Sequence, residues 1–152
     1  MKIISSAFEG NGYIPAKYSK MGGNISPPLR FIDVSQNAKS LVLVCHDPDA
    51  PIEGGFTHWL VWNIKPETSE ILEGDLPRDF TQGLNDWQTY KWDGPNPPSG
   101  THRYNFYLYA IDINLGLSSD AKRPDLLQAI NGHVIDTATL TGVFGSETTN
   151  KK

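Results

Sequence analysis

The sequence predicts a mainly β, antiparallel domain, and two patterns support this. Residues with high β propensity recur in short runs, many with a period of two. Gly, Pro, Asn and Asp separate these runs at short intervals, as they do in turns between antiparallel strands. With 152 residues and 38% hydrophobic content, the chain can close one core without a metal or a disulfide. We therefore expect a single domain over residues 1–145 and a frayed C-terminal tail over 146–152.

Three runs predict the central strands of one sheet. Residues 104–111 are rich in aromatic and branched side chains, which suits a strand packed on both faces. Residues 40–46 form an apolar run followed at once by turn residues, and residues 59–64 have the same character. Cys45 lies inside the first of these runs, so we expect a buried thiol. Residues 138–144 alternate as a final strand.

One helix is predicted over residues 123–133. Pro124 and Asp125 fall in its first turn, where both residue types are favoured. Leu126 and Ile130 follow at helical spacing. We expect this to be the only long helix.

Composition excludes several classes of partner. The chain has 13 basic and 17 acidic side chains and a formal net charge of -4, so no broad positive field attracts nucleic acid or an anionic membrane. No window reaches the ~20 apolar residues that span a bilayer, so we expect no membrane insertion. The first eight residues lack the apolar stretch of a secretory signal, which favours a cytoplasmic protein. The oligomeric state stays open, and a homodimer is compatible with these properties.

The first polar segment of interest is DPDAP at residues 47–51, directly after the apolar run. Two prolines stiffen this turn and hold the carboxylate of Asp47 at the end of the sheet. We expect a cis peptide bond before Pro51. His58 follows at the start of the next strand.

The second polar segment is the proline-rich loop over residues 94–101, which leads into His102, Arg103 and Tyr104. In an extended segment, residues 102 and 104 share one face, so His102 and Tyr104 can converge on one ligand. Arg103 points to the other face, where we expect it to pair with a carboxylate or a carbonyl. Both His58 and His102 are expected at sheet ends, outside the apolar interior.

Each feature has an ordinary structural explanation when taken alone. An Asp-Pro-Asp sequence is usually a turn, a histidine at a strand start is usually a surface or core residue, and a tyrosine in a strand usually packs. Two such units in one chain, each with an imidazole and a rigid proline loop at a strand end, predict a binding site.

These segments resemble the two signature regions of the phosphatidylethanolamine-binding protein family. Residues 22–29, GGNISPPL, are similar to the N-terminal segment of its bacterial and archaeal branch, which is called Raf-kinase-inhibitor-like. The resemblance covers roughly residues 1–145. It implies a two-sheet antiparallel β-sandwich with a few short peripheral helices and one small anion pocket. The pocket residues that it implies are Asp47, Pro51, His58, Gly94, Pro97, Pro98, His102 and Tyr104.

The side chains of such a pocket suit a phosphate-type anion. Imidazoles, the Tyr104 hydroxyl and backbone N–H groups can supply the donors that an anion needs. Asp47 would either accept a hydrogen bond from one imidazole and keep that ring cationic, or receive the ammonium of an ethanolamine-like ligand. With a cationic imidazole, the affinity for sulfate should fall as the pH rises. No cofactor and no metal are implied.

The function that we expect is binding of phosphate, a phosphomonoester or a phospholipid headgroup, without enzymatic turnover. The more serious alternative is an inhibitor or scaffold that docks a phosphorylated or acidic segment of a partner protein in the pocket and regulates a kinase or protease. The other alternative is a metal-assisted or other hydrolase acting on a phosphoester. Asp47, Asp49, His58 and His102 are suitable metal ligands, but no closely spaced His or Cys pair accompanies them. A serine hydrolase is a weaker alternative. Ser99 has His102 three residues away, but it lies in a proline-rich loop without a nucleophile elbow. The role of His46 is left open.

Overall fold

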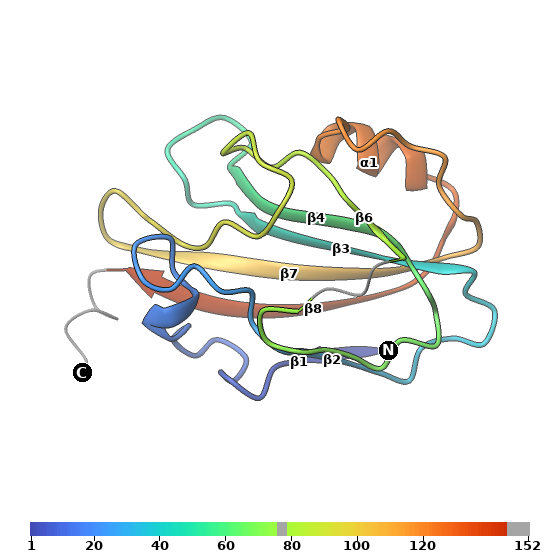
Figure 1. The fold of residues 1–152 in the computed structure, drawn as a ribbon, viewed down its shortest axis with the longest axis horizontal. Coiled ribbons are helices and arrows are strands. Elements are labelled where there is room, and N and C mark those ends of the chain that lie inside the picture. The colour runs from blue at the N-terminus through green and yellow to red at the C-terminus, as the bar shows by residue number, and fades with distance from the viewer. Residues whose placement is uncertain (76–78, 146–152) are drawn as a thin grey trace.

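The computed structural model describes residues 1–75 and 79–145, and within them two antiparallel sheets form the body of the protein (Figure 1). The smaller sheet has the order β1-β2-β5 and the larger one the order β6-β4-β3-β7-β8. The strands are β1 (Lys2–Ile4), β2 (Leu29–Ile32), β3 (Ser40–Asp47), β4 (Phe56–Ile64), β5 (Glu70–Ile71), β6 (Thr81–Gln82), β7 (Thr101–Ile111) and β8 (Val134–Gly145). The predicted fold class, a mainly β structure with two antiparallel sheets, is confirmed.

The predicted central strands are β3, β4 and β7, and they do lie next to one another in the larger sheet. Each strand continues beyond the apolar run that predicted it, because backbone pairing extends into polar residues. Asp47 still pairs with Phe56, and Thr101 pairs with Gly145. These extensions bring the polar residues of both signature segments to one end of the sheet.

The predicted helix forms as α1 (Arg123–Ile130) and ends three residues earlier than expected. Asn131 leaves the helical conformation, and Gly132 follows with a φ of +84°, a left-handed geometry that favours glycine and turns the chain toward β8. A single-turn 3-10 helix, η1 (Ala16–Tyr18), is the other helical element in residues 1–75 and 79–145. No helix in this described part is long and apolar enough to cross a membrane. The predicted frayed tail lies outside the described residues.

The larger sheet buries side chains on both faces. On β3, Leu41, Leu43 and Cys45 pack into the core shared with the smaller sheet. Val42 and Val44 point the other way, into a second cluster that includes residues of α1. Figure 1 shows α1 and the pair β1 and β2 on opposite sides of this sheet. A strand buried on both faces explains the continuous apolar run, and the Cys45 thiol is buried as predicted.

The main core should dominate stability. Truncating the fully buried Leu43 to Ala should lower the free energy of unfolding by about 2–5 kcal/mol, because the cavity that is left cannot be refilled. Leu72→Ala is the matched control, since this side chain is 57% exposed, and it should change stability by less than about 0.5 kcal/mol. Urea denaturation of both variants measures the difference. Similar losses at the two sites would contradict this assignment of the core.

Candidate functional site

A β-bulge in β4 aims His58 at the same side of the sheet as Asp47 and Tyr104. In the pairing of β3 with β4, Cys45 faces Trp59 and His46 faces Thr57, so His58 is an extra residue on β4. Trp59 points into the main core, and strict alternation would send its neighbour His58 to the opposite face. The extra residue breaks this alternation. As a result, His58 packs edge-on against Tyr104, with ring centroids 5.2 Å apart.

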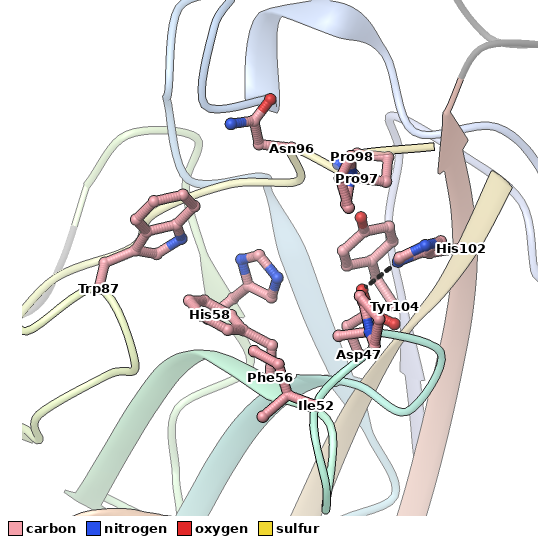
Figure 2. Close-up of a pocket in the computed structure, with 12 residues that line it drawn as sticks. Asp47, Ile52, Phe56, His58, Trp87, Asn96, Pro97, Pro98, His102 and Tyr104 are labelled. Atoms are coloured by element: carbon pink, nitrogen blue, oxygen red, sulfur yellow. Dashed lines mark hydrogen bonds and ion pairs between the residues drawn. The ribbon is translucent and has the colours of Figure 1, made fainter. Parts of the chain in front are cut away.

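The strand ends and the loops beside them enclose a cavity of about 180 Å³ (Figure 2). Seven of the eight predicted site residues line it, and Gly94 does not. The lining residues are Asp47, Ala50, Pro51, Ile52, Phe56, His58, Trp87, Asn96, Pro97, Pro98, His102 and Tyr104. None of them is a Lys or an Arg. The two signature segments, far apart in sequence, therefore meet around one small cavity.

Both carboxylate oxygens of Asp47 accept hydrogen bonds from neighbouring residues. Its Oδ2 accepts a hydrogen bond from Nδ1 of His102 at 2.6 Å, and its Oδ1 accepts one from the backbone N–H of Asp49 at 2.7 Å. The predicted contact between Asp47 and one imidazole is therefore present. Both groups are buried, with relative exposures of 3% for Asp47 and 7% for His102.

The turn that carries Asp47 is tied to β7 by an ion pair. The Arg103 guanidinium donates two hydrogen bonds to the Asp49 carboxylate, from Nε at 3.0 Å and from an Nη at 2.8 Å, which is the predicted role of Arg103. These bonds lower the pKa of Asp49 to about 2. The prediction of a cis bond before Pro51 is wrong, since this peptide bond is trans. The Arg103 ion pair and the Asp47 turn fix the loop without it.

His58 is buried rather than outside the interior, so that part of the sequence prediction is wrong. It is 3% exposed, and its Nδ1 lies 2.6 Å from the carbonyl oxygen of Asp93. His102 at 7% exposure is also buried, although both rings do lie at the sheet end. Burial lowers the pKa of His58, against smaller opposing effects of the Asp93 carbonyl and the Asp47 charge. The neutral ring is therefore favoured.

The Tyr104 hydroxyl has no hydrogen-bond partner among the described residues, although the side chain is only 1% exposed. Burial, followed by the nearby charge of Asp47, raises the pKa of Tyr104 well above its usual range. The phenol therefore stays protonated and can donate. Tyr104 lines the cavity, which is therefore the place where a partner for its hydroxyl can lie.

Behind His58, the carboxylate of Asp93 is fully buried and gathers hydrogen bonds from two loops. Its donors are Lys20 (2.7 Å), Lys91 (2.7 Å), Asn24 (2.9 Å), Asn85 (3.3 Å) and Thr89. Burial acts to raise the pKa of Asp93, but the bonds from the two lysines, Thr89 and Asn24 prevail and hold it below its usual range. This cluster fixes the carbonyl that orients His58.

Gly94 allows its loop to pack closely against the backbone of Tyr18 and does not line the cavity. A Cβ at this position would lie 1.9 Å from the carbonyl oxygen of Tyr18, so a larger residue would separate the two segments. The backbone N–H of Gly94 donates to Oδ1 of Asn24 at 2.7 Å. Asn24 belongs to the GGNISPPL segment, which therefore supports the site without lining the cavity.

Residues 4–145 match the phosphatidylethanolamine-binding protein family. The chain belongs to this family. A UPF0098 protein of the archaeon Methanothermobacter thermautotrophicus is 45% identical over 149 residues, which is 95% of this chain and 98% of the relative. A UPF0098 protein of Chlamydia trachomatis is 43% identical over 148 residues, so the relatives include archaeal and bacterial members.

Two solved structures of family members share the fold. A phosphatidylethanolamine-binding protein homologue from Chlamydia trachomatis is 42% identical, with a TM-score of 0.90 over 95% of this chain and 97% of the other. YbcL of Escherichia coli, a member of the mammalian family, has the same TM-score and the same coverage at 26% identity. The family fold therefore persists through large changes of sequence.

Sequence reasoning missed five residues that line this cavity: Ala50, Ile52, Phe56, Trp87 and Asn96. Ala50, Ile52 and Asn96 lie within or beside the predicted loops, so their proximity was a usable signal. Phe56 packs against His58, at 5.1 Å between centroids, and against Trp87 at 5.2 Å. The sequence around Trp87, LNDWQT, is polar but matches neither of the two signature segments, so it gave no signal for the site.

His46, whose role the sequence left open, supports the neighbouring turn through both ring nitrogens. It is 4% exposed, and its Nε2 lies 2.7 Å from the carbonyl oxygen of Gly54, an acceptor that requires a hydrogen on this nitrogen. Its Nδ1 lies 2.9 Å from the Thr57 hydroxyl. Burial lowers the pKa of His46, which favours the neutral ring. His46 thus closes the 52–57 turn instead of lining the cavity.

The metal-dependent alternative gains no support from this geometry. Asp47, His58 and His102 line one cavity, but residues 1–75 and 79–145 contain no group of three or more His, Cys, Asp or Glu side chains that could hold a metal ion. Asp49 is engaged by Arg103. The four candidate ligands therefore do not form a coordination site.

Asp93 should make stability depend on pH. Asp93→Asn should lower the free energy of unfolding at pH 7 by about 3 kcal/mol, because two ammonium groups lose their buried partner. Since the folded pKa of Asp93 is depressed, its contribution is present above the unfolded value of ~3.9 and is lost as the pH falls below it. Urea denaturation from about pH 7 to 3 should therefore give a flatter profile for the variant than for the wild type.

The exposed ion pair of Asp79 with Lys65 provides the control for this measurement. Asp79→Asn should change stability by less than about 1 kcal/mol and should leave the pH profile close to that of the wild type. Identical acid profiles for the wild type and Asp93→Asn would contradict the assignment.

Proposed function

We propose that this protein binds a small phosphate-bearing anion in the cavity formed by Asp47, His58, His102 and Tyr104, without turning it over. The observation that carries the proposal is the Tyr104 hydroxyl, a donor on a residue that is 1% exposed and lines the cavity, with no partner among the described residues. An oxyanion oxygen would satisfy it. Membership of the phosphatidylethanolamine-binding protein family supports a binding role.

The size of the cavity favours a small ligand or a small headgroup. Pockets for drug-sized ligands measure about 300–1,000 Å³, and this one measures about 180 Å³. Its walls are largely apolar, with Pro51, Pro97, Pro98 and Phe56 around a few polar groups. A low-dielectric wall strengthens each hydrogen bond to an anion, so few donors are sufficient.

A second candidate function is docking of a phosphorylated segment of a partner protein. A wider hollow of about 420 Å³ lies beside the first cavity and shares Asn96, Pro97 and Pro98 with it. A phosphorylated side chain in the small cavity could continue across this proline ridge into the hollow. A phosphopeptide that binds more tightly than inorganic phosphate would favour this function.

Both histidines should matter for binding. His58→Ala and His102→Ala should each weaken binding of inorganic phosphate by roughly 1.5–3 kcal/mol, because each removes a polar partner of the anion. His133→Ala is the control, since that ring is exposed and pairs with Asp112 at the other end of β7. Calorimetry on variants whose folding has been checked by circular dichroism measures the effect. Wild-type affinity for phosphate in both site variants would contradict the proposal.

Tyr104→Phe separates binding from folding more cleanly. The change removes only the hydroxyl, which has no partner among the described residues, so thermal stability should not fall. Phosphate affinity should drop roughly tenfold or more, as for a lost hydrogen bond to a charged group. Tyr109→Phe, in the cluster on the opposite face of the sheet, should leave affinity unchanged. Unchanged affinity in Tyr104→Phe would remove the main support for the site.

A further inference from the structure

Trp87 brings a second hydrogen-bond donor to the wall of the cavity, besides Tyr104. The indole Nε1 of Trp87 is shielded from solvent and has no hydrogen-bond partner among the described residues. An indole N–H can donate but cannot accept, so only an acceptor can satisfy it. Trp87 lines the cavity, and Figure 2 shows the nitrogen of its ring turned toward His58. A ligand in the cavity can therefore supply the acceptor that this N–H lacks.

The other three tryptophans of the chain do not share this arrangement. Nε1 of Trp59 and Nε1 of Trp92 donate to oxygen atoms of the protein, at 2.8 Å and 3.1 Å. Trp62 also has a buried Nε1 without a partner among the described residues, but it lies in the second cluster and does not line the cavity. Trp87 is thus the tryptophan whose free donor lies at the candidate site.

The surroundings of Trp87 fix its ring and strengthen the donor. Phe56 packs against it with 5.2 Å between the ring centroids and 69° between the ring planes. The ammonium of Lys20, which pairs with Asp93, lies 4.8 Å from the centroid of the Trp87 ring. A cation in this position draws electron density from the indole, which makes its N–H a better donor. The carboxylate of the neighbouring Asp86 lines another hollow and not this cavity.

Two neutral donors therefore lie on either side of His58. Figure 2 shows the His58 ring between Trp87 and Tyr104, and the Tyr104 hydroxyl has no partner among the described residues either. An oxyanion with two free oxygens on one centre can accept one hydrogen bond from each donor. A phosphodiester, a phosphomonoester and inorganic phosphate all have such a pair of oxygens.

We propose that Trp87 is a binding residue for the anion, and that its indole N–H and the Tyr104 hydroxyl each donate to one oxygen of the same anionic centre. The proposal rests on the proposed anion-binding function and adds a donor on the opposite side of His58. It explains how a cavity whose lining has no Lys or Arg can hold an anion. Because the indole N–H cannot accept, an ammonium group of a ligand gains no hydrogen bond from it.

Trp87→Phe keeps an aromatic ring and removes the indole N–H. Dimethyl phosphate, which represents a phosphodiester, and inorganic phosphate, which represents a free anion, are the probes. In calorimetry, the affinity of Trp87→Phe for a probe that binds the wild type should fall by roughly tenfold or more, as for a lost hydrogen bond to a charged group. Trp62→Phe is the matched control and should keep the wild-type affinity, because it also removes a buried N–H without a partner, but in the second cluster. Circular dichroism checks the folding of both variants.

NMR of protein labelled with nitrogen-15 at tryptophan gives a direct measurement on the wild type. Four indole signals are expected, and contacts with the Phe56 ring assign the one that belongs to Trp87, so no variant has to fold. Addition of dimethyl phosphate should move the Trp87 indole proton downfield, because a hydrogen bond to an anion deshields this proton. The indole proton of Trp62 should stay in place.

The outcomes separate the inference from the function on which it rests. Wild-type affinity in Trp87→Phe would overturn the inference, and a loss in Tyr104→Phe alone would leave the anion site in place. Lower affinity in Trp87→Phe without a shift of the wild-type indole proton would also overturn it, since the ring would then act only as an apolar wall. If neither probe binds the wild-type protein, the proposed function fails as well.

Discussion

The buried carboxylate of Asp93 is the group on which the geometry of the pocket depends. An ionised carboxylate away from water is stable only when its oxygens are fully hydrogen-bonded, so the donors around it cannot move independently. These donors come from residues 20–24 and 85–91, two segments that would otherwise be separate surface loops. The backbone of Asp93 holds His58 at the same time. Asp93 thus links the two loops to the imidazole of His58.

The remaining polar groups of the pocket lie on the ends of three adjacent strands. Asp47 ends β3, His58 lies near the start of β4, and His102 and Tyr104 lie near the start of β7. Because the body of each strand is anchored in the cores on both faces of the sheet, these side chains lose little freedom when a ligand arrives. Rigidity of the site is therefore a property of the sheet more than of its loops.

Most of the fold and part of the pocket could be predicted, for reasons that differ from residue to residue. Apolar runs identify β3, β4 and β7, and alternation alone places His102 and Tyr104 on one face. Alternation fails for His58, because the bulge that turns it depends on the register with β3, a long-range property. Trp87 was not predicted as a site residue, because an aromatic side chain in a loop carries no local sequence signal for a binding site. The expected cis bond was wrong because the Arg103 ion pair, formed across 54 residues, holds the turn.

The bulge also determines where the chain can change in length during evolution. His58 is the one residue between Thr57 and Trp59, so its deletion would restore strict alternation but remove the imidazole, and a residue inserted beside it would change the direction in which the ring points. The exposed turn at residues 52–54 lies outside the ladder, so insertions there would leave the aim of His58 unchanged. Homologues that bind the same ligand should therefore place their alignment gaps in this turn and keep the spacing from residue 57 to residue 59.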